Sequence, residues 1–230
     1  MRVILFGATG MVGAATLIEC FDDPRVTSVV AIVRRPTGKT HAKLREVLHQ
    51  DFYDYSSIKK VFVNADACFF CLGVSAVGKN EEEYTRLTYD LTLAAAKAMV
   101  SVNPQMAFVY ITGQSTDSTE HGSAMWARVK GRTENAILAL PFRAAYMLRP
   151  GYIQPMKGVR SGTRLYQWIY NVVTPLYPIF EKVAPNRMTT SERVGRAFIE
   201  VAANGYPKKI LEVPDINAIG ERRSASGGKN

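Results

Sequence analysis

The feature that most constrains the fold is a set of three glycines directly after the first apolar segment. Residues 2–6 have the pattern of a short buried strand, and residues 11–21 have helical character. Between them lie Gly7, Gly10 and Gly13, spaced as Gly-x-x-Gly-x-x-Gly. Such a short strand-to-helix turn needs glycine where the backbone bends and where the helix packs closely on the strand. The chain is therefore predicted to begin with a strand–turn–helix unit.

Strand and helix patterns continue to alternate along most of the chain, and the apolar strand at residues 67–72 is typical of a strand buried on both faces. This alternation predicts an α/β fold, with a doubly wound, Rossmann-like parallel sheet and a small C-terminal cap on the substrate side. Further predicted strands are Ser28–Val33, Leu44–Gln50, Ala107–Thr112, Ala144–Leu148 and Ile210–Val213, and predicted helices are Ser56–Val63, Glu81–Val102, Ala124–Leu140 and Glu192–Ala203.

The domain organisation follows from the same pattern. Residues 1–221 are expected to form a single domain, in which residues 152–189, rich in tyrosine, proline and other aromatics, form an irregular cap. Residues 222–230 consist mainly of serine, glycine and basic residues, and are expected to be a disordered tail.

The glycine turn also predicts a ligand. A helix that starts at such a turn offers free backbone N–H groups and the positive end of its dipole to phosphate. At the first turn of an α/β sheet, this arrangement is typical of dinucleotide binding. Thr9, Met11 and Val12 share the turn with the three glycines and are predicted to contact the cofactor.

The end of the second strand indicates which dinucleotide binds. NAD-binding chains usually carry an acidic residue there, which accepts a hydrogen bond from the ribose 2′-hydroxyl. This chain has Arg34 and Arg35 instead, and two guanidinium groups suit a 2′-phosphate. NADP(H) is therefore favoured over NAD(H) as the cofactor. Asp51 and Phe52, after the third strand, are placed to flank the adenine.

Several motifs together resemble the short-chain dehydrogenase/reductase superfamily, and most closely the TIP30-like oxidoreductases of its atypical branch. Besides the glycine turn and the arginine pair, they are Cys71-Leu72-Gly73, Val129-Lys130-Gly131 and Leu148-Arg149-Pro150-Gly151. The resemblance covers about residues 1–155 and implies further cofactor contacts at Leu72, Gly73, Thr112, Lys130, Pro150 and Gly151.

The resemblance also implies a Tyr-x-x-x-Lys catalytic pair, which this chain carries only in part. Lys130 is present, but Trp126 stands four residues before it, and an indole cannot cycle a proton near neutral pH. Tyr152 is one candidate for the displaced proton donor, with a packing aromatic as the alternative. Thr112 and Ser115 are candidates for the hydroxyl that holds the substrate oxygen.

Two functions fit these residues. The first is hydride transfer between NADPH and a small carbonyl or alcohol substrate, with the cap supplying an apolar pocket. The second is a non-catalytic NADP(H)-binding regulatory or sensor protein, which the Trp126 replacement favours. The protein is expected to be a monomer or a homodimer.

Composition narrows the other possibilities. The net charge of +9 is scattered and lacks a nucleic-acid-binding motif, so no nucleic-acid partner is expected. No apolar run is long enough for stable membrane insertion. Three cysteines without a disulfide framework favour a reducing, cytoplasmic location. Cys68 and Cys71 are interpreted as core thiols, and no metal site is predicted because no second ligand pair is near them in the sequence.

Overall fold

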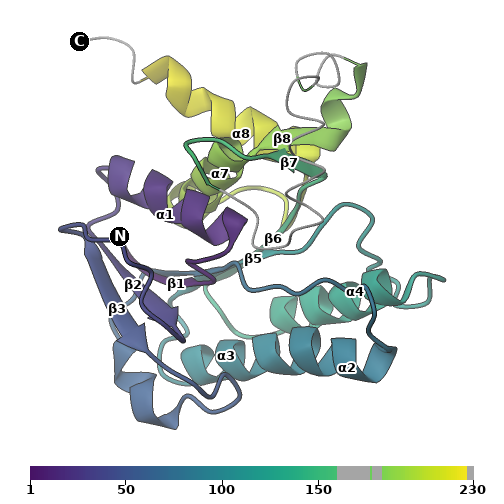
Figure 1. Ribbon diagram of the computed structural model, residues 1–230, viewed down its shortest axis with the longest axis horizontal. Coiled ribbons are helices and arrows are strands. Elements are labelled where there is room, and N and C mark those ends of the chain that lie inside the picture. The colour runs from purple at the N-terminus through teal and green to yellow at the C-terminus, as the bar shows by residue number, and fades with distance from the viewer. Residues whose placement is uncertain (160–176, 178–182, 227–230) are drawn as a thin grey trace.

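The computed structural model describes residues 1–159, 177 and 183–226 (Figure 1). Its main sheet has seven strands in the order β3-β2-β1-β4-β5-β6-β9, and every pair is parallel. This order reverses between β1 and β4, as in a doubly wound sheet, and so confirms the predicted fold class. The strands are β1 (Arg2–Phe6), β2 (Ser28–Val33), β3 (Leu44–Leu48), β4 (Ala67–Phe70), β5 (Ala107–Ile111), β6 (Ala144–Arg149) and β9 (Ile210–Glu212).

Helices cover both faces of the sheet (Figure 1). On one face, α1 (Met11–Asp22) packs against α7 (Ser191–Asn204), which packs against α8 (Val213–Ser226). On the other face lie α2 (Glu81–Thr85), α3 (Leu91–Val100) and α4 (Met125–Leu138). The crossovers that contain α-helices thus place them on one of the two faces, whereas β2 and β3 are joined by a loop without a helix.

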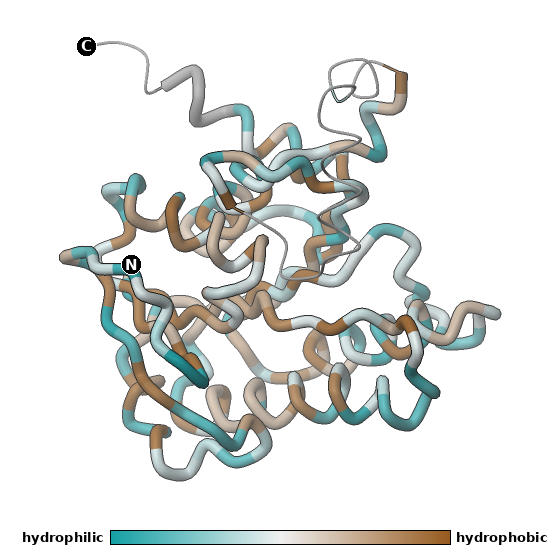
Figure 2. The backbone as a smooth tube through the Cα atoms, in the orientation of Figure 1, coloured by the Kyte–Doolittle hydropathy of each residue, from teal (hydrophilic) through white to brown (hydrophobic). Residues whose placement is uncertain are grey.

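Alternation along β1 produces two apolar cores. Val3 and Leu5 point to the α1 and α7 side, whereas Ile4 and Phe6 join the cluster that packs under α3. All four side chains are almost completely buried. The hydropathy colouring in Figure 2 shows brown central strands and teal surface loops. The closely packed sheet therefore holds in place the loops that follow its strands.

Two predicted helices differ in their details. The stretch predicted as one helix, Glu81–Val102, is split by a π-helical turn, η2 (Arg86–Asp90), and ends at Val100. Residues Ser56–Val61 form a 3-10 helix, η1, in place of the predicted α-helix. Hydrophobic periodicity detects a helix but does not distinguish these variants.

The C-terminal part contains the last helix and part of the predicted cap. Helix α8 continues to Ser226, beyond the predicted domain boundary at residue 221. The helix is anchored by the buried side chains of Ile216 and Ile219. In the predicted cap, β7 (Tyr152–Gln154) pairs in parallel with β8 (Met188–Thr190), after the short 3-10 helix η4 (Pro185–Arg187). Residues 160–176 and 178–182 of the cap lie outside the described residues.

Candidate functional site

Three adjoining cavities lie at the carboxyl ends of the parallel strands, where the strand order reverses. The arginine cavity, about 410 Å³, lies between the glycine turn and Arg34 and Arg35. The leucine cavity, about 570 Å³, is lined by Leu87 and Leu91. The lysine cavity, about 620 Å³, is lined by Lys130. Leu72 lines all three, so they form one groove at the position where doubly wound sheets bind ligands.

The three glycines of the turn have different structural roles. Gly7 has a φ of 78°, and a Cβ there would lie 2.7 Å from the carbonyl oxygen of Cys71. A Cβ at Gly13 would overlap the carbonyl oxygen of Gly7. At Gly10, a Cβ would meet only that same Gly7 oxygen, at 3.4 Å. Gly7 and Gly13 are therefore required by the protein's own packing, whereas Gly10 leaves space at the mouth of the groove.

The amino end of α1 is open to an anion. Its N-cap residue is Gly10, which has no side chain to satisfy the first N–H groups, and its first turn holds no acidic residue. Unpaired N–H groups and the helix dipole both favour a phosphate here. Met11 and Val12, in this first turn, line the lysine cavity. A glycine cradle at an uncapped helix end fits a pyrophosphate.

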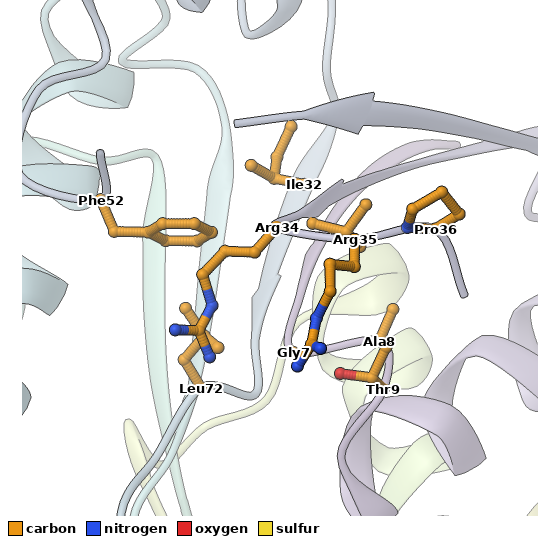
Figure 3. Close-up of a pocket in the computed structure, with 10 residues that line it drawn as sticks. Gly7, Ala8, Thr9, Ile32, Arg34, Arg35, Pro36, Phe52 and Leu72 are labelled. Atoms are coloured by element: carbon orange, nitrogen blue, oxygen red, sulfur yellow. The ribbon is translucent and has the colours of Figure 1, made fainter. Parts of the chain in front are cut away.

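Arg34 and Arg35 extend over the arginine cavity from the end of β2 (Figure 3). The Arg35 guanidinium points toward Thr9, and that of Arg34 lies between Phe52 and Leu72. Both side chains are exposed, and neither guanidinium makes an ion pair with a described residue. The arrangement leaves two cations free for an anionic ligand.

The leucine cavity lies beside the loop that follows β3. The Phe52 ring lines both this cavity and the arginine cavity, and packs edge-on against Phe6. Asp51 also lines the cavity, and its carboxylate accepts a hydrogen bond from the Tyr53 backbone at 2.9 Å. The Tyr53 hydroxyl donates to the carbonyl of Arg86 at 3.1 Å, which ties the loop to η2.

Trp126 and Lys130 line the lysine cavity one helical turn apart on α4. Lys130 Nζ donates to the backbone carbonyl of Thr112 at 2.7 Å. Burial lowers the pKa of the Lys130 ammonium to about 8, although the negative charge of Glu134 opposes this shift. Trp126 therefore lies beside a lysine whose ammonium form is destabilised by burial.

A buried ion pair that sequence reasoning missed supports this arrangement. Glu134 is fully buried, and its two carboxylate oxygens each accept from Arg149 Nε at 3.1 Å. The Thr112 hydroxyl donates to the same carboxylate at 2.5 Å, and Arg149 Nη2 donates to Ser118 Oγ at 2.5 Å. The network joins α4 to the ends of β5 and β6. The one signal in the sequence was an acidic residue, Glu134, at a position of the predicted helix that faces the sheet.

The other two hydroxyl groups predicted for the site, those of Ser115 and Tyr152, lie outside the lysine cavity. Ser115 is exposed, has a φ of 68° and does not line the lysine cavity. Ile153 lines this cavity, but its neighbour Tyr152 does not, because successive strand residues point to opposite faces. The Tyr152 hydroxyl donates to Gln154 at 3.1 Å. The structure thus brings Lys130 and the Thr112 backbone to the cavity, together with Leu72, Gly73, Pro150 and Gly151.

Two of the cysteines, Cys68 and Cys71, differ in their position relative to the groove. Cys68 is fully buried, whereas Cys71 partly lines the lysine cavity, and burial raises the pKa of its thiol to about 12. In the described part of the chain, no group of three histidine, cysteine or acidic residues is arranged to hold a metal ion. No described helix is both long and apolar enough to cross a bilayer.

Comparison with known proteins identifies relatives. The model of the "NAD dependent epimerase/dehydratase family" matches residues 3–123, slightly more than half of the chain. The fmp52 protein of Emericella nidulans is 32% identical over 165 residues, which are 66% of this chain and 66% of that protein. The FMP52 protein of Saccharomyces cerevisiae is 26% identical over 168 residues, 71% of this chain and 69% of that protein. The chain thus spans about two thirds of each relative's length.

Solved structures share the fold at low sequence identity. MoeE5 in complex with UDP-glucose and NAD superposes with a TM-score of 0.65 at 17% identity, covering 98% of this chain and 82% of that one. The PhqB reductase domain of Penicillium fellutanum gives a TM-score of 0.68 at 16% identity, covering 93% of this chain and 67% of that one. These similarities confirm the Rossmann-like architecture.

The comparisons also correct one expectation and limit another. The FMP52 relatives are named mitochondrial proteins, and this contradicts the predicted cytoplasmic location. The prediction was wrong because a scarcity of disulfides does not distinguish one reducing compartment from another. The narrower TIP30-like grouping stays a prediction. The family match ends before Trp126 and Lys130, so it covers the glycine turn but neither of these two residues. On this match, the chain belongs to the NAD-dependent epimerase/dehydratase family.

Proposed function

We propose that this protein is an NADP(H)-dependent oxidoreductase acting on a small carbonyl or alcohol. The observation that carries the proposal is the position of Arg34 and Arg35 beside the glycine turn, where neither guanidinium makes an ion pair with a described residue. A 2′-phosphate distinguishes NADP from NAD, and guanidinium groups bind phosphate with paired, charge-assisted hydrogen bonds. No acidic residue stands at the end of β2 to favour the free ribose hydroxyl of NAD.

The remaining groove residues support a consistent orientation of the cofactor. The glycine turn would hold the pyrophosphate, and Asp51 and Phe52 would flank the adenine. Lys130 would contact the nicotinamide ribose, beside Pro150 and Gly151. When bound, the nicotinamide supplies or accepts a hydride. The apolar residues Ile111, Trp126 and Ile153 would exclude water from the substrate.

The solved neighbours do not decide between the two cofactors. MoeE5 and the DesIV double mutant, a dTDP-glucose 4,6-dehydratase, were both solved with NAD bound. At 17% and 14% identity, these proteins share the fold rather than the contacts that select a cofactor. The preference for NADP(H) rests on this chain's own arginines.

A second candidate is a non-catalytic NADP(H)-binding protein with a regulatory or sensor role. Trp126 favours it, because an indole in place of tyrosine removes the usual proton donor. A monomeric or homodimeric state is compatible with both candidates and stays a prediction.

Two measurements separate the candidates. NADPH binding is followed by quenching of its fluorescence, and NADPH oxidation is then screened with aldehydes, ketones and quinones in wild type and in Trp126→Tyr. An oxidoreductase is expected to turn over at least one substrate class. Tight NADPH binding without turnover by either protein would refute the enzymatic function and leave the binding role.

A further inference from the structure

The lysine cavity contains few groups that can exchange a proton. Among the described residues that line it, the only titratable side chains are Cys71 and Lys130. Burial raises the pKa of the Cys71 thiol to about 12, so this thiol stays protonated and is a poor acid near neutral pH. Lys130 is left as the described cavity group that can release a proton under ordinary conditions.

Two hydroxyl groups belong to the described wall of the cavity, those of Ser75 and Thr112, and a serine or threonine hydroxyl is too weak an acid to titrate near neutral pH. The Ser75 hydroxyl accepts a hydrogen bond from the Val77 backbone at 3.2 Å. The Thr112 hydroxyl donates to the buried carboxylate of Glu134 at 2.5 Å. The Tyr152 hydroxyl donates to Gln154 at 3.1 Å, on the opposite face of β7 from the cavity-lining Ile153. Ser115 is exposed and absent from the cavity wall.

Lys130 is held so that its ammonium faces the cavity. One N–H donates to the Thr112 carbonyl at 2.7 Å, and a lysine ammonium has two further donors. Gly113 presents no side chain to cover Nζ, although a Cβ there would lie only 3.7 Å away. Trp126, one turn earlier on the same face of α4, has no hydroxyl for the lysine to activate.

The charges around Lys130 explain why it can release a proton. Glu134, on the same helix, stabilises the ammonium, but Arg149 at the end of β6 pairs with this carboxylate and offsets its charge. The Cys71 thiol, after β4, is neutral. Burial therefore dominates and lowers the pKa of Lys130 to about 8, near the value that suits general acid–base catalysis.

We infer that Lys130 itself donates the proton to the substrate oxygen during carbonyl reduction, in place of the missing tyrosine. This inference rests on the proposed oxidoreductase function. The substrate carbon would gain a hydride from NADPH, and the electron pair of the carbonyl π bond would move to the oxygen. The oxygen takes a proton from Lys130, so an O–H bond forms as an N–H bond of Lys130 breaks. The neutral amine then recovers a proton from water. In alcohol oxidation the same amine accepts the proton.

The activity test uses NADPH with 4-nitrobenzaldehyde and cyclohexanone as probes. Lys130→Arg keeps a positive charge but cannot release a proton near neutral pH. It is expected to lower kcat by ~10²–10⁴-fold, the usual contribution of a general acid, with NADPH affinity changed only a few-fold. The matched control is Lys97→Arg, at an exposed position on α3, which should leave kcat unchanged. Circular dichroism of each variant checks folding.

A second test reads the proton directly and does not depend on turnover. Protein labelled with ¹³C at lysine Cε is titrated by NMR, and the Lys130 signal is assigned by its loss in Lys130→Arg. One lysine, Lys130, should titrate near pH 8. Titration of Lys130 together with the exposed lysines would overturn the inference.

The outcomes of the activity test separate the two levels of the argument. Loss of kcat in Lys130→Arg with NADPH binding preserved supports Lys130 as the donor. Retained kcat with an unchanged pH profile overturns it, and so does wild-type protein that binds NADPH but reduces neither probe. If wild type fails to bind NADPH, the proposed function itself is wrong.

Discussion

The two ends of the groove are built in different ways. At the glycine turn, the shape is set by backbone packing, because Gly7 and Gly13 lie against main-chain atoms that leave no room for a Cβ. At the lysine cavity, the lining comes from separate segments of the chain, and the buried pair Glu134–Arg149, which does not itself line the cavity, joins α4 to the end of β6. The first end matches what the family requires for dinucleotide binding.

The difference places the proposed cofactor-binding turn and the proposed proton-transfer group in two separately built parts of the groove. The turn end lies within residues 3–123, which match the family, while Trp126 and Lys130 lie beyond the match. A chain can keep the backbone that holds a cofactor while the proton-transfer group changes. Substitutions at the two ends of the groove should therefore have different effects on stability and on NADPH binding.

Removing one of the buried charges beside the lysine cavity should cause the largest loss in the free energy of unfolding. Glu134→Ala leaves the Arg149 guanidinium with only the partly exposed carboxylate of Glu212, at 3.4 Å, and breaking a buried pair in this way costs ~3–5 kcal/mol. Urea denaturation measures the free energy of unfolding. Glu82→Ala, at an exposed position on α2, is the control and should change stability by less than about 0.5 kcal/mol. Equal stability of the two variants would contradict the buried network.

The turn end should separate stability from binding. Gly13→Ala places a methyl group on the Gly7 carbonyl and is expected to destabilise the fold by ~1–3 kcal/mol, as overpacking does. Gly10→Ala meets only one atom, at 3.4 Å, so folding should be nearly unchanged while NADPH affinity falls. Thermal melts and NADPH titrations distinguish the two. Intact NADPH affinity in Gly10→Ala would argue against a phosphate at this turn.

The arginine pair should decide between cofactors. Arg34→Ala removes a charge-assisted bond to the 2′-phosphate and should weaken NADPH binding by ~1–3 kcal/mol, leaving NADH binding nearly unchanged. Calorimetric titration with each nucleotide measures this. Arg45→Ala, an exposed arginine on β3, is the control. Equal losses for NADPH and NADH would refute the 2′-phosphate role.

The smallest effect is a pH dependence of cofactor binding. Only the ammonium form of Lys130 attracts an anionic cofactor, and its pKa in the free protein is about 8. NADPH affinity should therefore be greatest below pH 8 and fall as the pH rises through it. If binding raises this pKa by about one unit, the fall approaches ~tenfold. Titrations from pH 6.5 to 9.5 should show the fall in wild type and not in Lys130→Met.

These contrasts also explain how far the sequence could predict the molecule. The sheet and the turn were predictable because apolar alternation and glycine spacing are local signals. The Glu134–Arg149 pair was not, since its partners come from α4 and β6 and meet only in the fold. The orientation of Tyr152 away from the cavity depends on the pairing of β7 with β8, which leaves little trace in composition. The π-helical turn at Arg86–Asp90 was hidden for a similar reason, because its apolar spacing resembles that of an α-helix.

If Arg34 and Arg35 select the dinucleotide in this groove, the protein should discriminate between NADPH and NADH. The dissociation constants of wild-type protein for NADPH and NADH are compared in the same low-salt buffer. We predict that NADPH binds at least about tenfold more tightly, the equivalent of about 1.4 kcal/mol from the 2′-phosphate contacts. Equal affinities, or tighter binding of NADH, would contradict the claim.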